Sequence, residues 1–183
     1  ARSNNEHRLD APYRVTTGQD DLVFGPENAP ATILALVSLT CPHCRRWERQ
    51  EMPRILEEAR QGRVRLDIRN YPLDRHALLG AATVSCLPQE DRIAAHERLV
   101  APDRLPAEPW RAVFPEAEMP SEDRITELRL CADRRDVQQR IFGLSRRTGE
   151  EVRTSVVPTF VVGRTVVAGA VGAPVLLRMA AAS

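Results

Sequence analysis

The residues of this chain best suited to chemistry are two cysteines separated by two residues, in the tetrapeptide Cys41-Pro42-His43-Cys44. Two thiols at this spacing can close into a small disulfide and open again, so they can exchange electrons with other thiols. The motif follows an apolar run that is typical of a strand, residues 33–39, and precedes a charged segment that predicts a helix, residues 45–60. This context indicates a reversible redox site.

Cys41 is expected to be the attacking residue of the pair. It would lie at the N-terminus of the predicted helix, with Pro42 in the first turn, where free N–H groups and the helix dipole favour a thiolate. His43 can stabilise that thiolate further, and a stabilised thiolate makes the disulfide a stronger oxidant. Cys44, one turn into the helix, is expected to be buried and to resolve mixed disulfides.

A structural disulfide or half of a zinc site is the alternative interpretation of the motif. Zinc needs two more ligands, and the other two cysteines, Cys86 and Cys131, supply them only if their segments fold onto the motif. Structural zinc cysteines usually occur as two close pairs, and these two lie far apart in the sequence. We therefore expect no metal, and no cofactor other than the redox-active disulfide Cys41–Cys44.

Two kinds of pattern predict the strands that must position the cysteines. Residues 31–39 are a continuous apolar run, which is typical of a buried central strand. Residues 64–71 alternate apolar and charged side chains, which predicts a strand with one buried face. Residues 159–162 and 165–168 flank Gly163-Arg164, a two-residue hairpin turn.

The segment between these strands has a different character. Residues 74–149 are rich in Ala, Arg and Glu and are interrupted by prolines, which predicts a set of short helices ending near residue 148. A further helix is predicted over residues 173–182. We expect an α/β protein with a thioredoxin-like fold, a central mixed sheet flanked by helices, with an inserted helical domain. Its expected parts are a flexible N-terminal lead-in (residues 1–20), the thioredoxin-like domain (residues 21–73 and 150–183) and the inserted α-helical domain (residues 74–149).

The composition bounds the class of protein. A chain of 183 residues, 43% of them hydrophobic, fits one domain that carries an insertion. The net charge of +1 indicates neither a nucleic-acid partner nor a membrane surface. The chain begins with Ala1 rather than Met, so we expect a mature or trimmed form whose export signal or membrane anchor lies upstream.

Three segments resemble the DsbA-like thiol–disulfide oxidoreductases. Ser38-Leu39-Thr40-Cys41-Pro42-His43-Cys44 matches the active-site segment of that family. Arg69-Asn70-Tyr71-Pro72-Leu73-Asp74 is similar to the strand end that leads into the family's helical insertion. Val157-Pro158-Thr159-Phe160-Val161-Val162-Gly163 matches the cis-proline loop and the hairpin after it. The resemblance covers about residues 22–182.

The resemblance implies a peptide-binding role for the Val157-Pro158 segment. A cis bond before Pro158 would expose the Val157 backbone beside Cys41, where an extended peptide can pair with it as an added strand. The alternative is an ordinary trans-proline that begins a strand.

Cys86 and Cys131 resemble the second, non-catalytic disulfide of an alphaproteobacterial subgroup of these proteins. In an exported chain they most simply form a structural disulfide. Closing a loop of that size stabilises a fold by about 4 kcal/mol in the chain-entropy model, with measured values often lower.

The sequence departs from the family at positions that concern the buried cysteine. Enteric members have a buried Glu six residues before the first cysteine, where this chain has Ala35, and a Lys on a neighbouring strand, whereas this chain has no Lys. How Cys44 exchanges its proton is therefore open, with water or a backbone carbonyl as alternatives. Many members of the subgroup also have Thr where this chain has Val157.

Polar residues beside the motif allow two interpretations. Glu48 and Glu51 lie among three arginines that follow the motif: Arg45, Arg46 and Arg49. The arginines could raise the local potential at Cys41, but a solvated helix face on which they pair with the two glutamates is the interpretation we favour. His96, in the insertion, is expected to be a surface or packing residue.

These observations predict a dithiol oxidase that introduces disulfides into exported proteins through its Cys-Pro-His-Cys site. The expected partners are reduced or unfolded exported proteins and a DsbB-like membrane oxidase, the latter implied by the resemblance. The expected form is a monomer in the periplasm or another extracytoplasmic compartment, with no nucleic-acid partner.

Two other functions are compatible with the same sequence features. A reductase or isomerase of the same fold is the first, although isomerases usually carry an additional N-terminal dimerisation region and only about 20 residues precede the fold here. A non-catalytic peptide-binding or chaperone-like module is the second, and the intact Cys-Pro-His-Cys and Val-Pro segments argue against it.

Overall fold

The computed structural model describes residues 5–183, which fold around a six-stranded mixed sheet in the order β1-β6-β5-β3-β4-β2. β3 and β4 are parallel, and all other neighbouring strands are antiparallel. The strands are β1 Glu6–Arg8, β2 Leu22–Phe24, β3 Thr32–Val37, β4 Arg65–Asn70, β5 Thr159–Val162 and β6 Thr165–Ala168. The thioredoxin-like α/β fold predicted from the sequence is confirmed.

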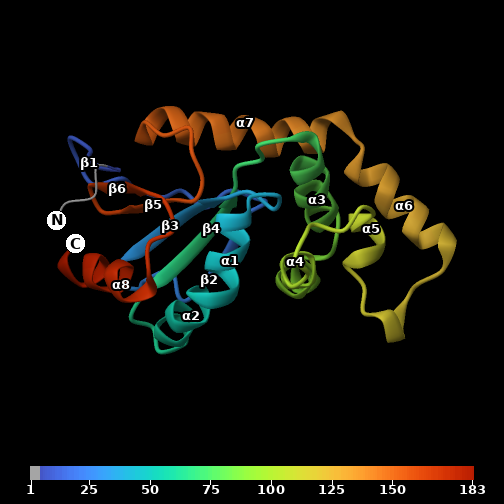
Figure 1. Ribbon diagram of the computed structural model, residues 1–183, viewed down its shortest axis with the longest axis horizontal. Coiled ribbons are helices and arrows are strands. Elements are labelled where there is room, and N and C mark those ends of the chain that lie inside the picture. The colour runs from blue at the N-terminus through green and yellow to red at the C-terminus, as the bar shows by residue number, and fades with distance from the viewer. Residues whose placement is uncertain (1–4) are drawn as a thin grey trace.

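Helices cover both faces of the sheet (Figure 1). α1 (Pro42–Gln50), α2 (Met52–Arg60) and α8 (Ala173–Ala182) pack on one face, and α7 (Arg135–Val152) packs on the other. The rest of the insertion lies beyond one end of the sheet. Its elements are α3 Arg75–Ser85, η1 Gln89–Asp91, α4 Arg92–Val100, α5 Pro109–Ala112, η2 Glu116–Glu118 and α6 Glu122–Ala132.

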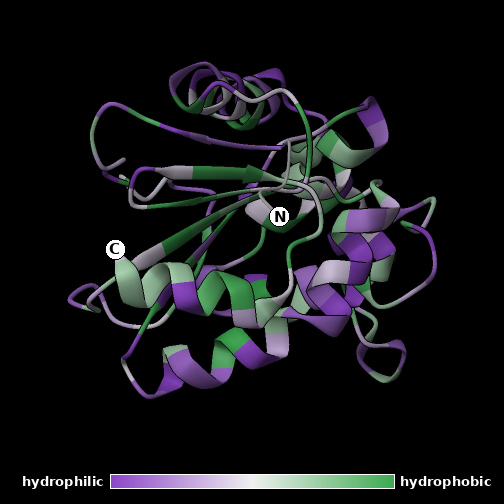
Figure 2. Cartoon of the chain, turned by 60° about the vertical axis from the view of Figure 1, so that its left-hand side comes forward, coloured by the Kyte–Doolittle hydropathy of each residue, from purple (hydrophilic) through white to green (hydrophobic). Residues whose placement is uncertain are grey.

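The central strand β3 contributes to a hydrophobic core on each side of the sheet. Side chains alternate along a strand, so Ile33, Ala35 and Val37 face α1, α2 and α8, whereas Leu34 and Leu36 face α7. All five are fully buried. This two-sided burial explains the continuous apolar run, and Figure 2 shows the apolar strands lying between helices.

Strand β4 is buried on both faces, and the prediction of a single buried face is wrong. Asp67 and Arg69 lie on its charged face, yet both are buried. Arg69 forms a salt bridge of 2.8 Å with Asp21 and donates a hydrogen bond of 2.9 Å to the Thr148 hydroxyl on α7. Paired partners allow a charged side chain to be buried, and alternation alone does not reveal them.

The prediction of a flexible lead-in over residues 1–20 is wrong for the part that the structure describes; residues 1–4 lie outside it. β1 pairs with β6 at the edge of the sheet. The chain then continues along the hairpin, where the backbone N–H of Tyr13 donates to the Gly163 carbonyl at 2.8 Å. These contacts involve backbone groups, so a polar, aperiodic sequence can form them without a side-chain pattern.

The predicted boundary between insertion and sheet domain, at residues 149–150, lies inside one continuous helix. α7 extends to Val152 and ends at Arg153, which has a left-handed conformation with φ of 59°. Gly149 is inside the helix rather than after it. A Cβ at that position would lie 2.8 Å from the Thr154 carbonyl oxygen and 3.1 Å from the Tyr71 ring. The glycine therefore permits close packing instead of ending the helix.

None of the helices within residues 5–183 is long and apolar enough to cross a lipid bilayer.

Candidate active site

The two cysteines of the motif lie where β3 leads into α1. Cys41 is the N-cap of α1, with extended backbone angles (φ −79°, ψ 118°), and Pro42 follows in the first turn, where its missing N–H leaves no hydrogen bond unmade. The loop before the helix is tied to the insertion, because the Thr40 hydroxyl donates a hydrogen bond of 2.7 Å to Asp74, the N-cap of α3. The local pattern of strand, turn and proline thus places Cys41 at a helix N-terminus.

The surroundings of Cys41 favour its thiolate. The side chain is 8% exposed and its thiol is free. A hydrogen bond from Cys44 lowers the pKa of Cys41 most, whereas burial raises it. Hydrogen bonds from the backbone N–H groups of Cys44 and His43, and the charge of His43, lower it further. The resulting pKa of Cys41 is about 6. At neutral pH this cysteine is therefore largely ionised.

The surroundings of Cys44 have the opposite effect. Its free thiol is 0% exposed, and burial raises its pKa far above the ordinary value, with the neighbouring Cys41 adding to the effect. Its sulfur accepts a hydrogen bond of 3.4 Å from the backbone N–H of Ser38, which lowers the pKa only in part. Above about pH 6 the reduced pair therefore consists of one ionised thiol, Cys41, and one protonated thiol, Cys44.

The Val157–Pro158 peptide bond is cis, and it lies beside Cys41. The Cys41 sulfur lies 3.8 Å from the carbonyl oxygen of Val157, to which the protonated thiol can donate a hydrogen bond. Val156, the residue before, is exposed, as is Leu73, whose backbone N–H donates to the Ser38 hydroxyl at 3.3 Å. Exposed apolar side chains thus lie on two loops that adjoin the cysteine pair.

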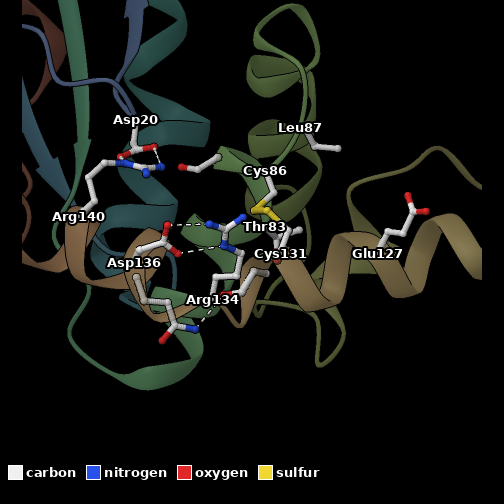
Figure 3. The surroundings of a disulfide bond; sticks show 12 residues. Asp20, Thr83, Cys86, Leu87, Glu127, Cys131, Arg134, Asp136 and Arg140 are labelled. Atoms are coloured by element: carbon white, nitrogen blue, oxygen red, sulfur yellow. Dashed lines mark hydrogen bonds and ion pairs between the residues drawn. A yellow bond between two sulfur atoms is a disulfide. The ribbon is translucent and has the colours of Figure 1, made fainter.

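The other two cysteines form a disulfide in the insertion (Figure 3). Cys86, at the C-terminal end of α3, is bonded to Cys131 near the end of α6, with 6.1 Å between their Cα atoms. The bridge lies at the end of α3 opposite to Asp74 and the active-site loop. Because the two sulfurs are bonded to each other, they are not available as zinc ligands for the motif.

Arg45 is buried in the interface between α1 and the insertion, so the expected solvated face is wrong at this position. The side chain is 2% exposed, and its guanidinium donates to the carbonyl oxygens of Leu39 (2.8 Å), Val100 (3.2 Å) and Pro102. Arg49 donates to the same Val100 carbonyl at 3.0 Å. Val100 ends α4, and a helix C-terminus attracts cations, which accounts for the position of both arginines.

Glu48 and His96 form a buried contact that the sequence interpretation missed. Glu48 is 4% exposed and His96 is 3% exposed, and Glu48 Oε1 lies 2.6 Å from His96 Nε2. Neither the expected pairing of Glu48 with the arginines nor an isolated packing role for His96 describes this arrangement. One signal was present in the sequence: Glu48 lies four residues after Cys44, on the same helix face as that buried thiol.

The family model described as thioredoxin matches residues 17–177 of the chain. Among solved structures, the chain is similar to oxidised BdbD from Bacillus subtilis, with a TM-score of 0.76, 15% identity, and coverage of 96% of this chain and 97% of that one. Alpha-DsbA1 from Wolbachia pipientis gives a TM-score of 0.70 and 16% identity, covering 88% and 89% of the two chains. A thioredoxin-like oxidoreductase from Silicibacter pomeroyi DSS-3 gives a TM-score of 0.70 and 19% identity, covering 89% of this chain and 91% of that one. Comparison by sequence with curated proteins finds no significant match. At these identities the structural likeness concerns the fold.

Proposed function

The chain belongs to the thioredoxin family and has the fold of DsbA-like proteins, and from this premise we propose that it is a thiol–disulfide oxidoreductase that introduces disulfides into exported proteins. The observation that carries the proposal is that the pKa values of two neighbouring thiols are shifted in opposite directions. The pKa of Cys41 is lowered to about 6, whereas that of Cys44 is raised. A thiolate stabilised in this way is a good leaving group, and its stability favours the reduced form of the pair.

The proposed reaction begins from the Cys41–Cys44 disulfide. A substrate thiolate attacks the Cys41 sulfur, the more exposed of the two; the bond to Cys44 breaks, and Cys44 leaves and takes up a proton. A second substrate thiolate then attacks the substrate sulfur of the mixed disulfide, and Cys41 leaves as its thiolate. The substrate loses two electrons and gains a disulfide, and the Cys41–Cys44 pair gains those electrons.

The cis Val157–Pro158 loop is the proposed site for the substrate backbone. An extended peptide that pairs with Val157 would lie next to the Cys41 sulfur, which is within hydrogen-bonding distance of the Val157 carbonyl. The exposed side chains of Val156 and Leu73 offer apolar contacts to such a peptide. Unfolded chains expose apolar residues and extended backbone, so they fit this surface.

The Cys86–Cys131 disulfide supports an extracytoplasmic location for the protein, because disulfides persist mainly in oxidising compartments. A DsbB-like membrane oxidase is the proposed acceptor of electrons from reduced Cys41 and Cys44. Such a partner would return the pair to the disulfide form after each reaction.

The redox potential of the Cys41–Cys44 pair tests the direction of the reaction. The protein is equilibrated with mixtures of reduced and oxidised glutathione, the free thiols are alkylated, and the reduced fraction is measured by mass. An oxidase is expected to remain largely reduced in mixtures that fully oxidise an ordinary dithiol. A pair more reducing than glutathione would overturn the proposal and would favour a reductase.

A further inference from the structure

A buried pair of ionisable side chains, Glu48 on α1 and His96 on α4, joins the active-site helix to the insertion. Glu48 Oε1 and His96 Nε2 are 2.6 Å apart, and both side chains are almost completely buried. Burying two ionisable groups is costly unless they are paired, and a structural contact between two helices does not require them. One member of the pair, Glu48, lies on α1, the helix that also carries Cys44.

The pair has hydrogen-bonding capacity left over. Within the described part of the chain, Glu48 Oε2 and His96 Nδ1 have no hydrogen-bond partner although both atoms are buried. A buried polar atom without a partner is uncommon, and a carboxylate oxygen in this state is a ready proton acceptor. The other oxygen is held by His96, so Oε2 is the atom available for proton transfer.

Cys44 is the group nearest in the sequence that must gain and lose a proton. Residues four apart on a helix have Cβ atoms about 5–6 Å apart, so Glu48 and Cys44 share one buried face of α1. The charge of Glu48 is also among the causes that raise the pKa of Cys44. The two groups thus affect each other electrostatically inside the protein.

Within the described residues, other elements offer Cys44 no fully buried carboxylate. Within residues 5–183 the buried carboxylates are Asp21, Glu48 and Asp67, and Asp21 and Asp67 interact with Arg69 on the face of the sheet that α7 covers. On the face that Cys44 shares, β3 presents the methyl group of Ala35. Glu48 is therefore the buried carboxylate on the thiol's side of the sheet.

We propose that Glu48 is the proton acceptor and donor for Cys44 and that His96 is its positioning residue. When the Cys44 thiol attacks a mixed disulfide, its sulfur forms a bond with the Cys41 sulfur and the bond from Cys41 to the partner sulfur breaks. The partner leaves as a thiolate, and the Cys44 proton passes to Glu48 Oε2. In the opposite direction Glu48 returns the proton to Cys44 as it leaves. The inference rests on exchange at Cys41–Cys44, as proposed above, but not on its direction.

Several charges surround the pair and tune it. Burial lowers the pKa of His96, but the charge and hydrogen bond of Glu48, with a smaller contribution from Glu97 on α4, raise it overall; the buried guanidinium of Arg45 opposes them. His96 therefore favours its protonated form, whose ring N–H can hold Glu48 Oε1 in place. The insertion thus supplies a group to the chemistry of the sheet domain.

Two-step exchange with oxidised glutathione tests the proposal. Reduced protein is mixed rapidly with oxidised glutathione between pH 5 and 9, and acid-quenched samples are analysed by mass for the mixed disulfide at Cys41 and for the closed disulfide. Glu48→Gln keeps the size of the side chain, and Glu57→Gln, an exposed glutamate on α2, is the matched control.

For Glu48→Gln we expect the first step, attack by Cys41, to stay within about two-fold of the unmodified protein, and the second step to slow about ten-fold or more at pH 7. The mixed disulfide should accumulate, and raising the pH should restore the second step, because hydroxide then removes the Cys44 proton. Glu57→Gln should change neither step. A folded Glu48→Gln variant with an unchanged second step, or with both steps slowed equally, would overturn the assignment.

The unmodified protein and His96→Gln give a second test that does not depend on the folding of Glu48→Gln. With a protein base, the second-step rate of the unmodified protein should rise by much less than ten-fold per pH unit; a ten-fold rise per pH unit throughout would show that hydroxide is the base and overturn the inference. His96→Gln should make the second-step rate rise more steeply with pH, and an unchanged pH profile removes His96 from its role. If the unmodified protein does not exchange with glutathione at all, the proposed function fails, and the inference with it.

Discussion

The sulfur of Cys41 and the carbonyl oxygen of Val157 are 3.8 Å apart, although 116 residues separate them in the chain. The contact joins the start of α1 to the backbone edge that precedes β5. Under the proposed function, a peptide that pairs with this edge would lie beside the Cys41 sulfur.

The first prediction concerns the reactivity of Cys41. Because its pKa is lowered to about 6, the rate of its alkylation by iodoacetamide should rise through half of its maximum near pH 6. Cys44 should stay unmodified over the same range, since burial raises its pKa. Mass analysis of alkylated peptides measures both rates. Half-maximal alkylation of Cys41 above pH 8 would contradict the proposed thiolate.

The lowered pKa of Cys41 also makes the stability of the reduced protein depend on pH. A pKa that is lower in the folded than in the unfolded state stabilises the fold above the unfolded value, and the stabilisation is lost as the pH falls through the folded value, about 6. With Cys41→Ser, this contribution between pH 6 and 9 should disappear from urea unfolding curves of the reduced protein.

Asp67 should make the fold less stable at higher pH. Burial, and then the neighbouring Asp21, raise the pKa of Asp67 above the ordinary value of aspartate, with opposition from Arg69 and Arg65. A raised pKa stabilises the fold below the unfolded value, about 4, and this stabilisation is lost as the pH rises through the folded value, about 8.

Asp67→Asn should therefore raise the melting temperature at pH 8 by about 2–4 °C for each kcal/mol recovered and change it much less at pH 5. Thermal unfolding followed by circular dichroism at the two pH values measures the difference. An equal change at both values would show that ionisation of Asp67 is not the cause.

Arg45 should stabilise the contact between α1 and the insertion. Arg45→Met keeps the aliphatic part of the side chain but removes three hydrogen bonds to backbone carbonyls, so we expect the free energy of unfolding to fall by about 3 kcal/mol. The matched control is its exposed neighbour: Arg46→Met should stay within about 0.5 kcal/mol. Urea unfolding measures both, and similar effects of the two changes would refute the anchoring role.

The Cys86–Cys131 disulfide should stabilise the insertion. Replacing both cysteines with Ala removes a loop closure over 45 residues, which is worth up to about 4 kcal/mol in the chain-entropy model. The loss is measured by urea unfolding. An independent check is a thiol count in denaturant after mild reduction, which should find two thiols, from Cys41 and Cys44; four would show that the second bond is labile.

Local patterns predicted the elements that form from short stretches of sequence. The hairpin of β5 and β6 has the predicted bounds, and so has α8, because turn residues and apolar runs act over a few positions. The buried strand β3 was predicted for the same reason. The start of α1 was correct because Pro42 favours the first turn of a helix.

Contacts between distant segments could not be predicted in this way. The pairing of β1 with β6 uses backbone groups, and Arg45 is buried because carbonyls at the end of α4 accept its hydrogen bonds. Glu48 and His96 are 48 positions apart, and each alone resembles an ordinary surface residue. Only the arrangement of the insertion against α1 shows that the two side chains meet.

The continuity of α7 also bears on how such a protein can evolve. Val137 and Ile141, near its start, belong to the core that includes the insertion, whereas Val152, at its end, packs with β3, β5 and β6. The insertion is therefore joined to the sheet domain through a continuous helix, with no flexible connection at its C-terminal end. Exchange of the insertion between relatives would preserve both cores only if the crossover point fell within α7 and kept its helical phase.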